Sequence, residues 1–515
     1  MKSKDHSLRT GILDGVKVLD LSRMLSGPYA TMLLADHGAE VIKIESAEGD
    51  SSRRSGPFKE NDTKKDWSGY FISLNRNKKS ICLNLKKKDD LNFLKKLIKD
   101  VDVLVENFRP DVMERLGLSF EEVSKINPRI VYGSISGFGT DIFGKSPYKN
   151  WPSYDVVAQA MGGLISLTGY DENNPLKVGP GIADIFSGSL LSFGLLASIL
   201  KSRATGKSQF VEVAMYDAIV SLCERAIYQY DFNGVIPKPE GNGHPLLAPF
   251  GIYNAKDGFV AIGIVENSYW NVLKQIINSA DLNNDLKYGT IALRAKNRIE
   301  LNKKINIWTK GFSKKELGNL LGAKVPFGPV NSVKELFEDE HLSNRNMILE
   351  IEQPFGKGKS WKIAGNPVKF KGFDSFNLSP PILGEHKNLY ANNFKSNISN
   401  KGKNSFQPQK QVYRCKVTFT NKDNKIIEIY ANSFTWLNSK ETYLICSVSK
   451  NEFTPNKNFL KSVNFYFHKI TRQKDEHKED IDLLNIKLSE KDISDVLLID
   501  TEAETLISTK YDNLV

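Results

Sequence analysis

The chain has 515 residues, of which 40% are hydrophobic and 25% charged, and this is enough apolar material for more than one packed core. No apolar segment reaches about 18 uninterrupted residues and the start MKSKDHSLRT has no apolar stretch, so we expect neither a membrane span nor a secretion signal and place the chain in the cytoplasm. The formal charge of +11 is spread along the chain, so we expect no nucleic-acid and no membrane partner.

Short apolar strands alternate with helical stretches from residue 16 onward, which is typical of an open parallel α/β sheet. The strand-like segments are VKVLDL, EVIKIE, SICLNL, DVLVEN and RIVYGSIS, which begin at residues 16, 40, 80, 102 and 129. Helices are expected over Tyr29–His37, Asp89–Lys99 and Asp111–Leu116. Such sheets bind ligands at the carboxyl ends of their strands. The first strand is followed by Ser26-Gly-Pro28 and not by G-x-G-x-x-G, which makes a nicotinamide dehydrogenase a poor fit.

An aspartate, Asp184, stands between glycines immediately before a long apolar run from Ile185 to Leu200. The run reads as a buried helix that ends at Lys201, so Asp184 would lie at the helix N-terminus, where unpaired N–H groups and the helix dipole favour a negative charge. The segment alone leaves two roles open for Asp184, a simple N-cap or a functional carboxylate.

The four cysteines are scattered along the chain without CxxC spacing. Neither a disulfide framework nor a zinc site is therefore predicted. No H-E-x-x-H pattern supports any other metal, so we expect no metal site.

Thirteen short segments, in order, resemble the family III (CaiB/BaiF-type) CoA-transferases. They are Leu13–Ser22, Gly27-Pro28, Ala35–Glu45, Gly49-Asp50, Asn77–Ser80, Val105–Pro110, Gly137–Gly139, Tyr154-Asp155, Gln159-Ala160, Gly206–Gln209, Gly241–Pro245, Pro326–Pro329 and Leu383–His386. The resemblance covers residues 11 to 390 or so. It implies a Rossmann-like parallel sheet domain that binds coenzyme A, a smaller α/β domain and an interlocked homodimer.

The resemblance places the CoA contacts on loops at the strand ends and on one following helix. The positions carried over are Leu25, Ser26, Leu83, Asn84, Leu85, Lys86, Asn107, Phe108, Arg109 and Arg115. Cations and backbone donors suit an adenosine diphosphate, and amide partners suit pantetheine. The chain departs from formyl-CoA transferase at Ser46-Ala47, where that enzyme has an arginine, and Arg53 or Arg54 is a candidate to replace it.

The resemblance makes Asp184 the catalytic nucleophile. An ionised aspartate needs no general base to attack a thioester carbonyl. The implied reaction passes through a mixed anhydride and then an aspartyl-CoA thioester, from which CoA is transferred to an acceptor carboxylate. CoA esters are thus substrates, and no permanently bound cofactor is expected. We expect the donor to be succinyl-CoA or another dicarboxylyl-CoA, and the glycines at 179, 181 and 188 to permit close backbone approach to the developing oxyanion.

A mobile loop beside the active site of the family matches Gly241, Asn242, Gly243 and His244, which we expect to close over the substrate. The alternative is a plain turn that leads into the strand FGIYNA. Two further cations, Arg225 and Lys238, are candidates to hold a second carboxylate.

Two other functions stay open. The α-methylacyl-CoA racemases share this fold and resemble much of the chain, but their histidine base lies just before the aspartate that matches Asp155, where this chain has Tyr154. A tyrosine is a poor base at neutral pH, which favours the transferase. The third possibility is a module that binds CoA esters without turnover and serves the C-terminal extension as a sensor.

Five segments make up the predicted domain organisation. The family-like part gives a large domain over residues 11–224, a small domain over 225–328 and a return to the large domain over 329–390. A polar linker follows at 391–412. The extension at 413–515 is β-rich (α+β), because YRCKVTFTN, KIIEIYANSFTWL and TYLICSVS read as alternating strands that weakly resemble the last strands of a PAS-type sensor domain. A charged run over Arg472–Asp480 predicts a helix there.

Overall fold

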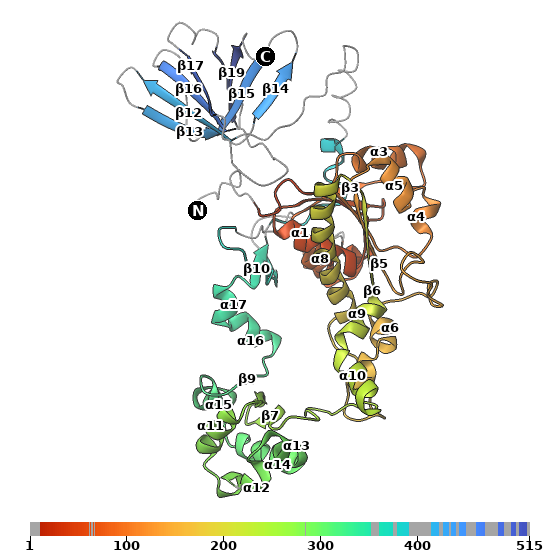
Figure 1. Ribbon diagram of the computed structural model, residues 1–515, viewed down its shortest axis with the longest axis vertical. Coiled ribbons are helices and arrows are strands. Elements are labelled where there is room, and N and C mark those ends of the chain that lie inside the picture. The colour runs from red at the N-terminus through yellow and green to blue at the C-terminus, as the bar shows by residue number, and fades with distance from the viewer. Residues whose placement is uncertain are drawn as a thin grey trace. The chain divides into compact units, whose positions relative to one another are not determined.

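The computed structural model describes residues 11–390, except 61, 63, 64, 66, 284, 352–359 and 374–377, and eight strands between Arg414 and Tyr511. The chain splits into two compact units, residues 1–391 and 392–515, and each is described by itself (Figure 1). The predicted linker at 391–412, the charged run Arg472–Asp480 and the N-terminal stretch lie outside the described residues.

A six-stranded parallel sheet forms the centre of the first unit, with the order β3-β2-β1-β4-β5-β6. The strands are β1 (Lys17–Asp20), β2 (Glu40–Glu45), β3 (Lys78–Cys82), β4 (Val103–Glu106), β5 (Val131–Ser136) and β6 (Gln209–Ala214). In register, Val18 of β1 lies between Val41 and Val103. The predicted parallel α/β sheet is confirmed, although β3 begins two residues earlier than expected. The strand order reverses between β1 and β4, where sheets of this kind bind ligands.

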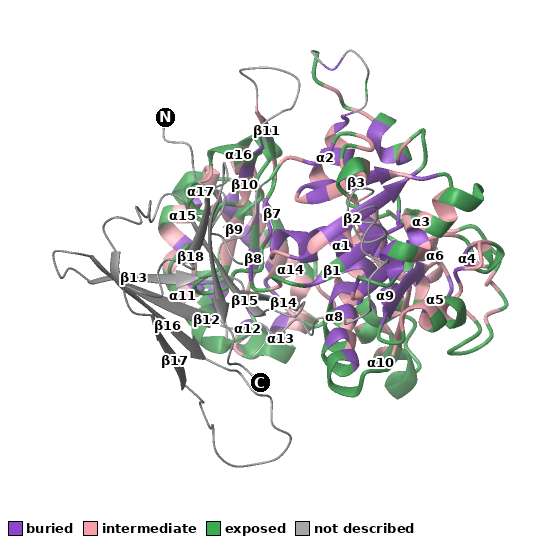
Figure 2. Cartoon of the chain, turned by 90° about the horizontal axis from the view of Figure 1, so that it is seen from above, coloured by how far each residue is buried: buried purple, intermediate pink, exposed green. Residues whose placement is uncertain are grey.

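Helices surround the sheet (Figure 2). They are α1 (Ser26–Asp36), α2 (Gly69–Asn75), α3 (Lys88–Ile98), α4 (Val112–Arg115), α5 (Phe120–Ile126), α6 (Asp155–Met161), α7 (Leu164–Leu167), α8 (Ile182–Thr205), α9 (Met215–Leu222) and α10 (Glu224–Asn233), with a 3₁₀ turn η1 (Ser51–Arg54). Three of these elements, α1, α3 and α4, correspond to the helices predicted from the sequence. The apolar sides of α1, α6, α8 and α9 pack against the sheet in the main core.

The long helix α8 begins three residues before the predicted run and ends at Thr205, where Gly206 adopts a left-handed conformation. Among the described residues, α8 alone is long and apolar enough to cross a membrane by length and composition. It packs against α1, β5 and β6, and its residues Leu191, Leu195 and Ile199 belong to the main core. We therefore describe it as a core helix of the sheet domain.

A second core lies around the antiparallel sheet β7-β8-β9. Its elements are β7 (Phe250–Ala255), β8 (Gly258–Gly263), α11 (Asn267–Ile277), η2 (Ala280–Asn283), α12 (Asp285–Tyr288), α13 (Ile291–Lys296), α14 (Arg298–Thr309), α15 (Lys314–Leu321) and β9 (Phe327–Pro329). The strand FGIYNA expected in this part of the chain is present as β7. The boundaries given for the domains stay predictions.

The chain then returns to the parallel sheet. The returning elements are α16 (Val333–Glu338), α17 (Glu340–Asn344), β10 (Ile348–Ile351) and β11 (Trp361–Ala364). Trp361 packs on Trp67 and Ile72, Asn366 donates to the carboxylate of Asp36, and the N–H of His386 donates to the carbonyl of Ser80. These contacts attach residues 361–390 to the side of the sheet that carries β2 and β3.

The described strands of the second unit form two antiparallel sheets of four strands, β13-β12-β16-β17 and β14-β15-β19-β18. They are β12 (Arg414–Asn421), β13 (Ile426–Ala431), β14 (Phe434–Asn438), β15 (Thr442–Ser449), β16 (Leu460–His468), β17 (Leu483–Leu488), β18 (Val496–Asp500) and β19 (Glu504–Tyr511). The first four occupy the segments predicted as strands. The likeness to a PAS-type domain stays a prediction, and the strands pair in two sheets.

Buried ion pairs lie beneath the carboxyl edge of β1 to β3. Asp20 accepts from Lys78 Nζ at 2.9 Å and from Thr31 Oγ1 at 2.7 Å, and Lys43 Nζ lies 2.9 Å from a carboxylate oxygen of Asp50. Burial opposes the charge on Asp20, but Lys78 and Lys43 outweigh it and hold the pKa of Asp20 well below its usual range. Burial also lowers the pKa of Lys78 to about 8, which still leaves the lysine charged at neutral pH, so the pair is ionised.

The same network fixes the loop that follows β1. Lys43 Nζ donates to the carbonyl of Ser22 at 2.8 Å, and Asp50 accepts from the N–H of Met24 at 3.2 Å. When one member of a buried ion pair is removed, the charge of the other stays buried without a partner. The loop after β1 therefore depends on Asp20, Lys43, Asp50 and Lys78 together.

We predict that Asp20→Ala lowers the free energy of unfolding by about 3–5 kcal/mol, because Lys78 would remain buried without its carboxylate. Urea unfolding of the full chain followed by tryptophan fluorescence measures this loss. Lys79→Ala is the matched control, because its pair with Glu40 is partly exposed and is worth less than about 1 kcal/mol. Equal losses in the two variants would contradict this account of the buried network.

Candidate active site

Asp184 lies in the first turn of α8, and another residue supplies the cap of that helix. Gly181 is the N-cap residue, and the carboxylate of Asp155 accepts from the N–H of Ala183 at 2.8 Å. Asp155 is itself held by Gln159, whose side-chain amide donates to it at 2.6 Å. The simple N-cap role that the sequence left open for Asp184 is therefore filled by Asp155.

The carboxyl group of Asp184 is partly buried, and its surroundings make it a stronger base than an ordinary aspartate. Burial and the nearby charge of Asp155 raise the pKa of Asp184 to about 6, while a hydrogen bond with Ser26 acts in the opposite direction. Burial and the charge of Asp184 also raise the pKa of Tyr70, to about 12. At pH 7 the carboxylate is thus mostly ionised.

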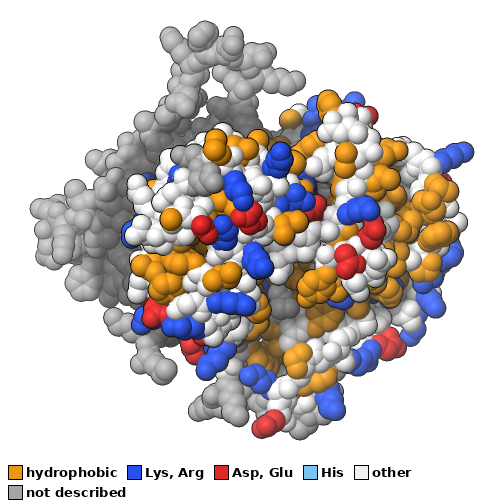
Figure 3. Space-filling view, turned by 90° about the horizontal axis from the view of Figure 1, so that it is seen from below, with side chains coloured by type: hydrophobic (Ala, Val, Ile, Leu, Met, Phe, Trp, Pro, Cys, Tyr) orange, Lys and Arg blue, Asp and Glu red, His pale blue; other side chains and the backbone are white. Residues whose placement is uncertain are grey.

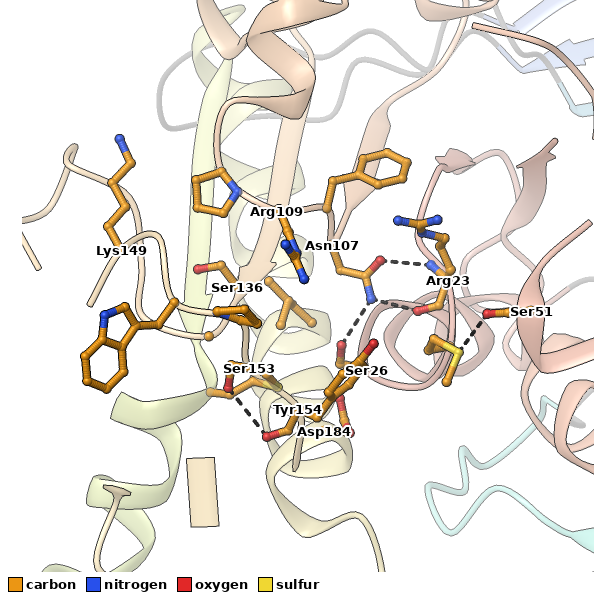
Figure 4. Close-up of a pocket in the computed structure, with 18 residues that line it drawn as sticks. Arg23, Ser26, Ser51, Asn107, Arg109, Ser136, Lys149, Ser153, Tyr154 and Asp184 are labelled. Atoms are coloured by element: carbon orange, nitrogen blue, oxygen red, sulfur yellow. Dashed lines mark hydrogen bonds between the residues drawn. The ribbon is translucent and has the colours of Figure 1, made fainter. Parts of the chain in front are cut away.

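Asp184 opens into a cavity of about 260 Å³ (Figure 4). The lining residues come from the loops after β1, β4 and β5, from the segment before α6 and from α8. They are Arg23, Met24, Ser26, Ser51, Asn107, Phe108, Arg109, Pro110, Ile135, Ser136, Gly137, Lys149, Trp151, Pro152, Ser153, Tyr154, Asp184 and Met215. Three of them are cations and one is a carboxylate, so the cavity favours anionic ligands.

A second cavity, of about 670 Å³, lies at the ends of β2 and β3. It is lined by the segment Leu83–Lys86, by residues 43–51 and by Arg54, Val112 and Leu116. Arg23, Ser51 and Phe108 line both cavities, so the two adjoin one another. Together they offer space for a long ligand with one end at Asp184 and the other beside Lys86.

The turn after β4 joins these cavities, and its side chains are held by reciprocal hydrogen bonds. Asn107 accepts from the N–H of Arg23 at 2.9 Å and donates to the carbonyl of Arg23 at 2.8 Å and to Ser26 Oγ at 3.3 Å (Figure 4). The guanidinium of Arg23 lies 5.1 Å from the ring centre of Phe108. The turn and the loop after β1 therefore act as one wall.

Eight of the ten predicted CoA contacts line the cavities. Ser26, Asn107, Phe108 and Arg109 line the first, and Leu83, Asn84, Leu85 and Lys86 line the second. The other two do not line either cavity. Arg115 is exposed on α4, although Val112 and Leu116 on either side line the second cavity, and Leu25 lies against Gly181 beside Asp184.

Arg53 and Arg54, the two candidates to replace the family arginine, have different surroundings in the structure. Arg53 is buried, pairs with Glu45 at 2.7 Å, and its guanidinium lies 3.7 Å from the ring centre of Phe71. Its charge is therefore compensated inside the protein. Arg54 lines the second cavity and is the remaining candidate.

Two cations of the first cavity were missed in the sequence, Arg23 and Lys149. Lys149 pairs with Asp141 at 2.8 Å and lies 3.7 Å from Asp111. Lys149 lies five residues before Tyr154-Asp155, a segment that resembles the family. This closeness in sequence could have marked Lys149 as a candidate site residue.

The loop Gly241–His244 does not line either cavity. The N–H of Gly241 donates to the carbonyl of Gly169 at 3.1 Å, and His244 accepts from the N–H of Leu246 at 3.1 Å and packs on Phe250. Its role as a substrate loop stays a prediction. The two candidate cations beside it do not line the cavities either: Lys238 pairs with Glu172 at 2.5 Å, and the charge of Arg225, after burial, helps to lower the pKa of His244.

The glycines around Asp184 permit close packing. A Cβ at Gly181 would lie 2.8 Å from Leu25 Cδ2, and one at Gly188 would lie 2.6 Å from the carbonyl oxygen of Ser26. A Cβ at Gly179 would meet nothing within 4 Å. Gly188 therefore lets the start of α1 lie directly against α8, which places Ser26 near Asp184.

Basic residues are spread over the first unit beyond the cavities. On the face shown in Figure 3, Lys and Arg side chains alternate with acidic and hydrophobic ones. Among the described residues there is also no group of three His, Cys, Asp or Glu side chains arranged to hold a metal ion.

Comparisons with known proteins agree with this fold. A sequence profile described as CoA-transferase family III matches residues 13–387. The chain is 39% identical over 378 residues to a succinyl-CoA:mesaconate CoA-transferase of Haloarcula marismortui, covering 73% of this chain and 95% of that protein. It is 34% identical over 380 residues to a succinyl-CoA:glutarate CoA-transferase of Mus musculus, covering 73% and 84%.

A solved structure of a CAIB/BAIF family protein from Brucella suis matches with a TM-score of 0.66 and 31% identity, covering 75% of this chain and 100% of that one. The chain belongs to CoA-transferase family III. It is an enzyme of the CoA-transferase class, and its relatives include transferases that use succinyl-CoA.

Glu106, at the end of β4, should make the stability of the fold depend on pH. Its buried carboxyl group accepts from the N–H of Phe108 at 2.8 Å, and burial raises its pKa to about 7. The folded chain thus keeps a proton that the unfolded chain loses near pH 4.5, so this stabilising contribution is complete below pH 4.5 and is lost as the pH rises through 7.

We predict that Glu106→Gln removes this dependence, because glutamine keeps the acceptor for Phe108 and carries no charge. Between pH 5 and pH 8 the wild type should lose up to about 3 kcal/mol relative to the variant, measured by urea unfolding of both proteins at each pH. Parallel stability curves would show that the carboxyl group is already ionised in the folded chain at pH 5.

Proposed function

We propose that this enzyme moves CoA from succinyl-CoA, or another dicarboxylyl-CoA, to a carboxylic acid through an aspartyl-CoA thioester on Asp184. The observation that carries the proposal is the carboxylate of Asp184 on the cavity wall, with the cap of its helix supplied by Asp155. A carboxylate with this freedom can attack a bound thioester.

The charges of the cavity support a dicarboxylate as the acyl group. Arg23, Arg109 and Lys149 line it together with Asp184. Guanidinium and ammonium groups bind carboxylates by charge-assisted hydrogen bonds. The proteins similar to this chain include CoA-transferases for mesaconate and for glutarate, and both carry succinyl-CoA in their names.

In the first step, a carboxylate oxygen of Asp184 attacks the thioester carbonyl and CoA leaves as the thiolate, which gives a mixed anhydride. The thiolate then attacks the carboxyl carbon of Asp184 and expels the donor acid, which leaves Asp184 as a CoA thioester. The acceptor carboxylate repeats the two steps in reverse and departs as its CoA ester. The raised pKa of Asp184 makes its carboxylate more nucleophilic than that of an ordinary aspartate, while most of it stays ionised at pH 7.

The side chains that line the cavity favour the transferase over the racemase. A racemase needs an acid and a base on opposite sides of the α-carbon. Among the described residues that line the cavity with Asp184, none is a histidine, and the position before Asp155 is held by the exposed side chain of Tyr154.

We predict that Asp184→Ala and Asp184→Asn abolish CoA transfer by at least about 10³-fold and leave folding intact, because the nucleophile is removed from a partly exposed position. Peptide-level mass spectrometry after mixing with succinyl-CoA should find CoA on the peptide of Asp184 in the wild type only. Retained turnover in either variant, or an adduct on another residue, would refute the assignment.

We also propose a homodimer, because large apolar side chains are exposed on α8 and α10. Phe193 and Leu200 on α8 are 74% and 71% exposed, and Phe232 on α10 is 79% exposed. Ile227 and Tyr230 also lie exposed on α10, and none of the residues of α10 is buried. A helix of this composition is normally covered by protein.

We predict that the protein sediments as a dimer and that Ile227→Lys with Phe232→Lys shifts it toward the monomer, because two charges would enter the buried contact. Analytical ultracentrifugation at several concentrations measures the change. Lys79→Ala, whose residue lies in β3, should leave the dimer intact. A wild-type chain that sediments as a monomer at every concentration would contradict the proposal.

A further inference from the structure

Ser26 stands between the turn after β4 and the nucleophile. Its side chain is buried, lines the cavity beside Asp184 and is bound by the amide of Asn107 at 3.3 Å (Figure 4). A hydrogen bond between Ser26 and Asp184 counteracts the effect of burial on the acid. The serine hydroxyl therefore links Asn107 to the carboxylate that we propose as the nucleophile.

The amide of Asn107 has a fixed orientation, and this decides which way the serine proton points. Its oxygen accepts from the N–H of Arg23, so its nitrogen faces the carbonyl of Arg23 and Ser26 Oγ. An amide nitrogen only donates. Ser26 Oγ thus accepts from Asn107, and its own proton is free for Asp184.

Three of the N–H groups at the start of α8 are already used, and the Ser26 hydroxyl is a side-chain donor beside them. The N–H of Ile182 donates to the carbonyl of Pro180, that of Ala183 to Asp155, and that of Ile185 to the carbonyl of Gly181. The nearby side chain of Leu25 is apolar. These three donors are therefore occupied, whereas the Ser26 hydroxyl has a proton to give.

We propose that the Ser26 hydroxyl is a catalytic donor to the oxyanion that forms on Asp184, and that Asn107 is the positioning residue that orients it. The proposal rests on the proposed function, because it concerns the steps at the carboxyl carbon of Asp184.

In the step that forms the aspartyl-CoA thioester, the CoA thiolate adds to the carboxyl carbon of the mixed anhydride. The carbonyl electron pair moves onto the oxygen that faces Ser26, and the hydroxyl stabilises the resulting charge by a hydrogen bond without giving up its proton. When the intermediate collapses, the carbonyl re-forms and the donor acid leaves as a carboxylate. The same donor acts again when the acceptor acid attacks the thioester.

The test compares Ser26→Ala and Ser26→Cys with wild type and with Ser189→Ala. Ser189 is a serine on the same helix as Asp184, does not line the cavity, and hydrogen-bonds the carbonyl of Ile185 within α8. Cysteine keeps the size of serine and is a weak donor. Rapid mixing with succinyl-CoA, acid quenching and mass spectrometry give the rate of adduct formation on Asp184, and steady-state rates over pH 5 to 8 give the acid limb of kcat/KM.

We expect Ser26→Ala to form the adduct about 10²-fold more slowly, Ser26→Cys to fall between it and wild type, and Ser189→Ala to match wild type. Because the hydrogen bond from Ser26 lowers the pKa of Asp184, its loss should also move the acid limb of kcat/KM to higher pH. A purely structural role would not move this limb.

The outcomes separate the two proposals. A wild-type rate and an unmoved acid limb in Ser26→Ala would overturn the role of Ser26 and leave the proposed function standing. A slow Ser26→Ala with an unmoved limb and weakened binding of CoA would also overturn it, since the serine would then only shape the pocket. No adduct on Asp184 in the wild type would overturn the proposed function, and the role of Ser26 with it.

Discussion

The hydrogen bond from the N–H of Ala183 to Asp155 is the contact on which the site depends. A helix start needs an acceptor for its free N–H groups, and an aspartate in the first turn would ordinarily serve that need itself. Because Asp155 comes from a different helix and takes this position, α8 begins stably while the carboxylate of Asp184 stays on the cavity wall. The same arrangement places two acids close together, which contributes to the raised pKa of Asp184.

The buried charges under β1 to β3 hold another wall of the cavity in place, the loop after β1. Asp20, Lys43, Asp50 and Lys78 compensate one another, and through Ser22 and Met24 they hold the loop that carries Arg23 and Ser26. Such a network brings little net stability compared with a well-packed apolar core, yet it fixes polar backbone at the edge of a sheet. We regard it as the support of this wall of the cavity.

The sheet could be predicted from the sequence because alternation of short apolar strands and helices is a local signal. The strands β1 to β5, the helices α1 and α3 and the long helix before Gly206 were visible in this way, whereas β6 was not predicted. Asp184 and eight of the ten residues predicted to contact CoA line the two cavities, and they were chosen because whole segments resemble the family. The local sequence pattern and the resemblance to the family were together sufficient to predict these elements and to choose these residues.

What the sequence did not reveal depends on contacts between distant segments. Arg23 and Asn107 are 84 positions apart and form one wall only after folding. Arg53 and Arg54 are adjacent and chemically alike, and only burial against Glu45 assigns the first to the interior. Leu25 was predicted to contact CoA; it lies against Gly181 at the helix start and does not line either cavity.

The glycine at position 188 has a consequence for changing the substrate. It lies one turn beyond Asp184 and lets the backbone of Ser26 touch α8, so the distance between the Asp184 carboxylate and the Ser26 hydroxyl is set by the absence of a side chain. A larger residue there would push the two helices apart and misplace both groups together. Room for a bulkier acyl chain must therefore be sought at other residues of the cavity wall, such as Trp151 and Tyr154, whose side chains are exposed.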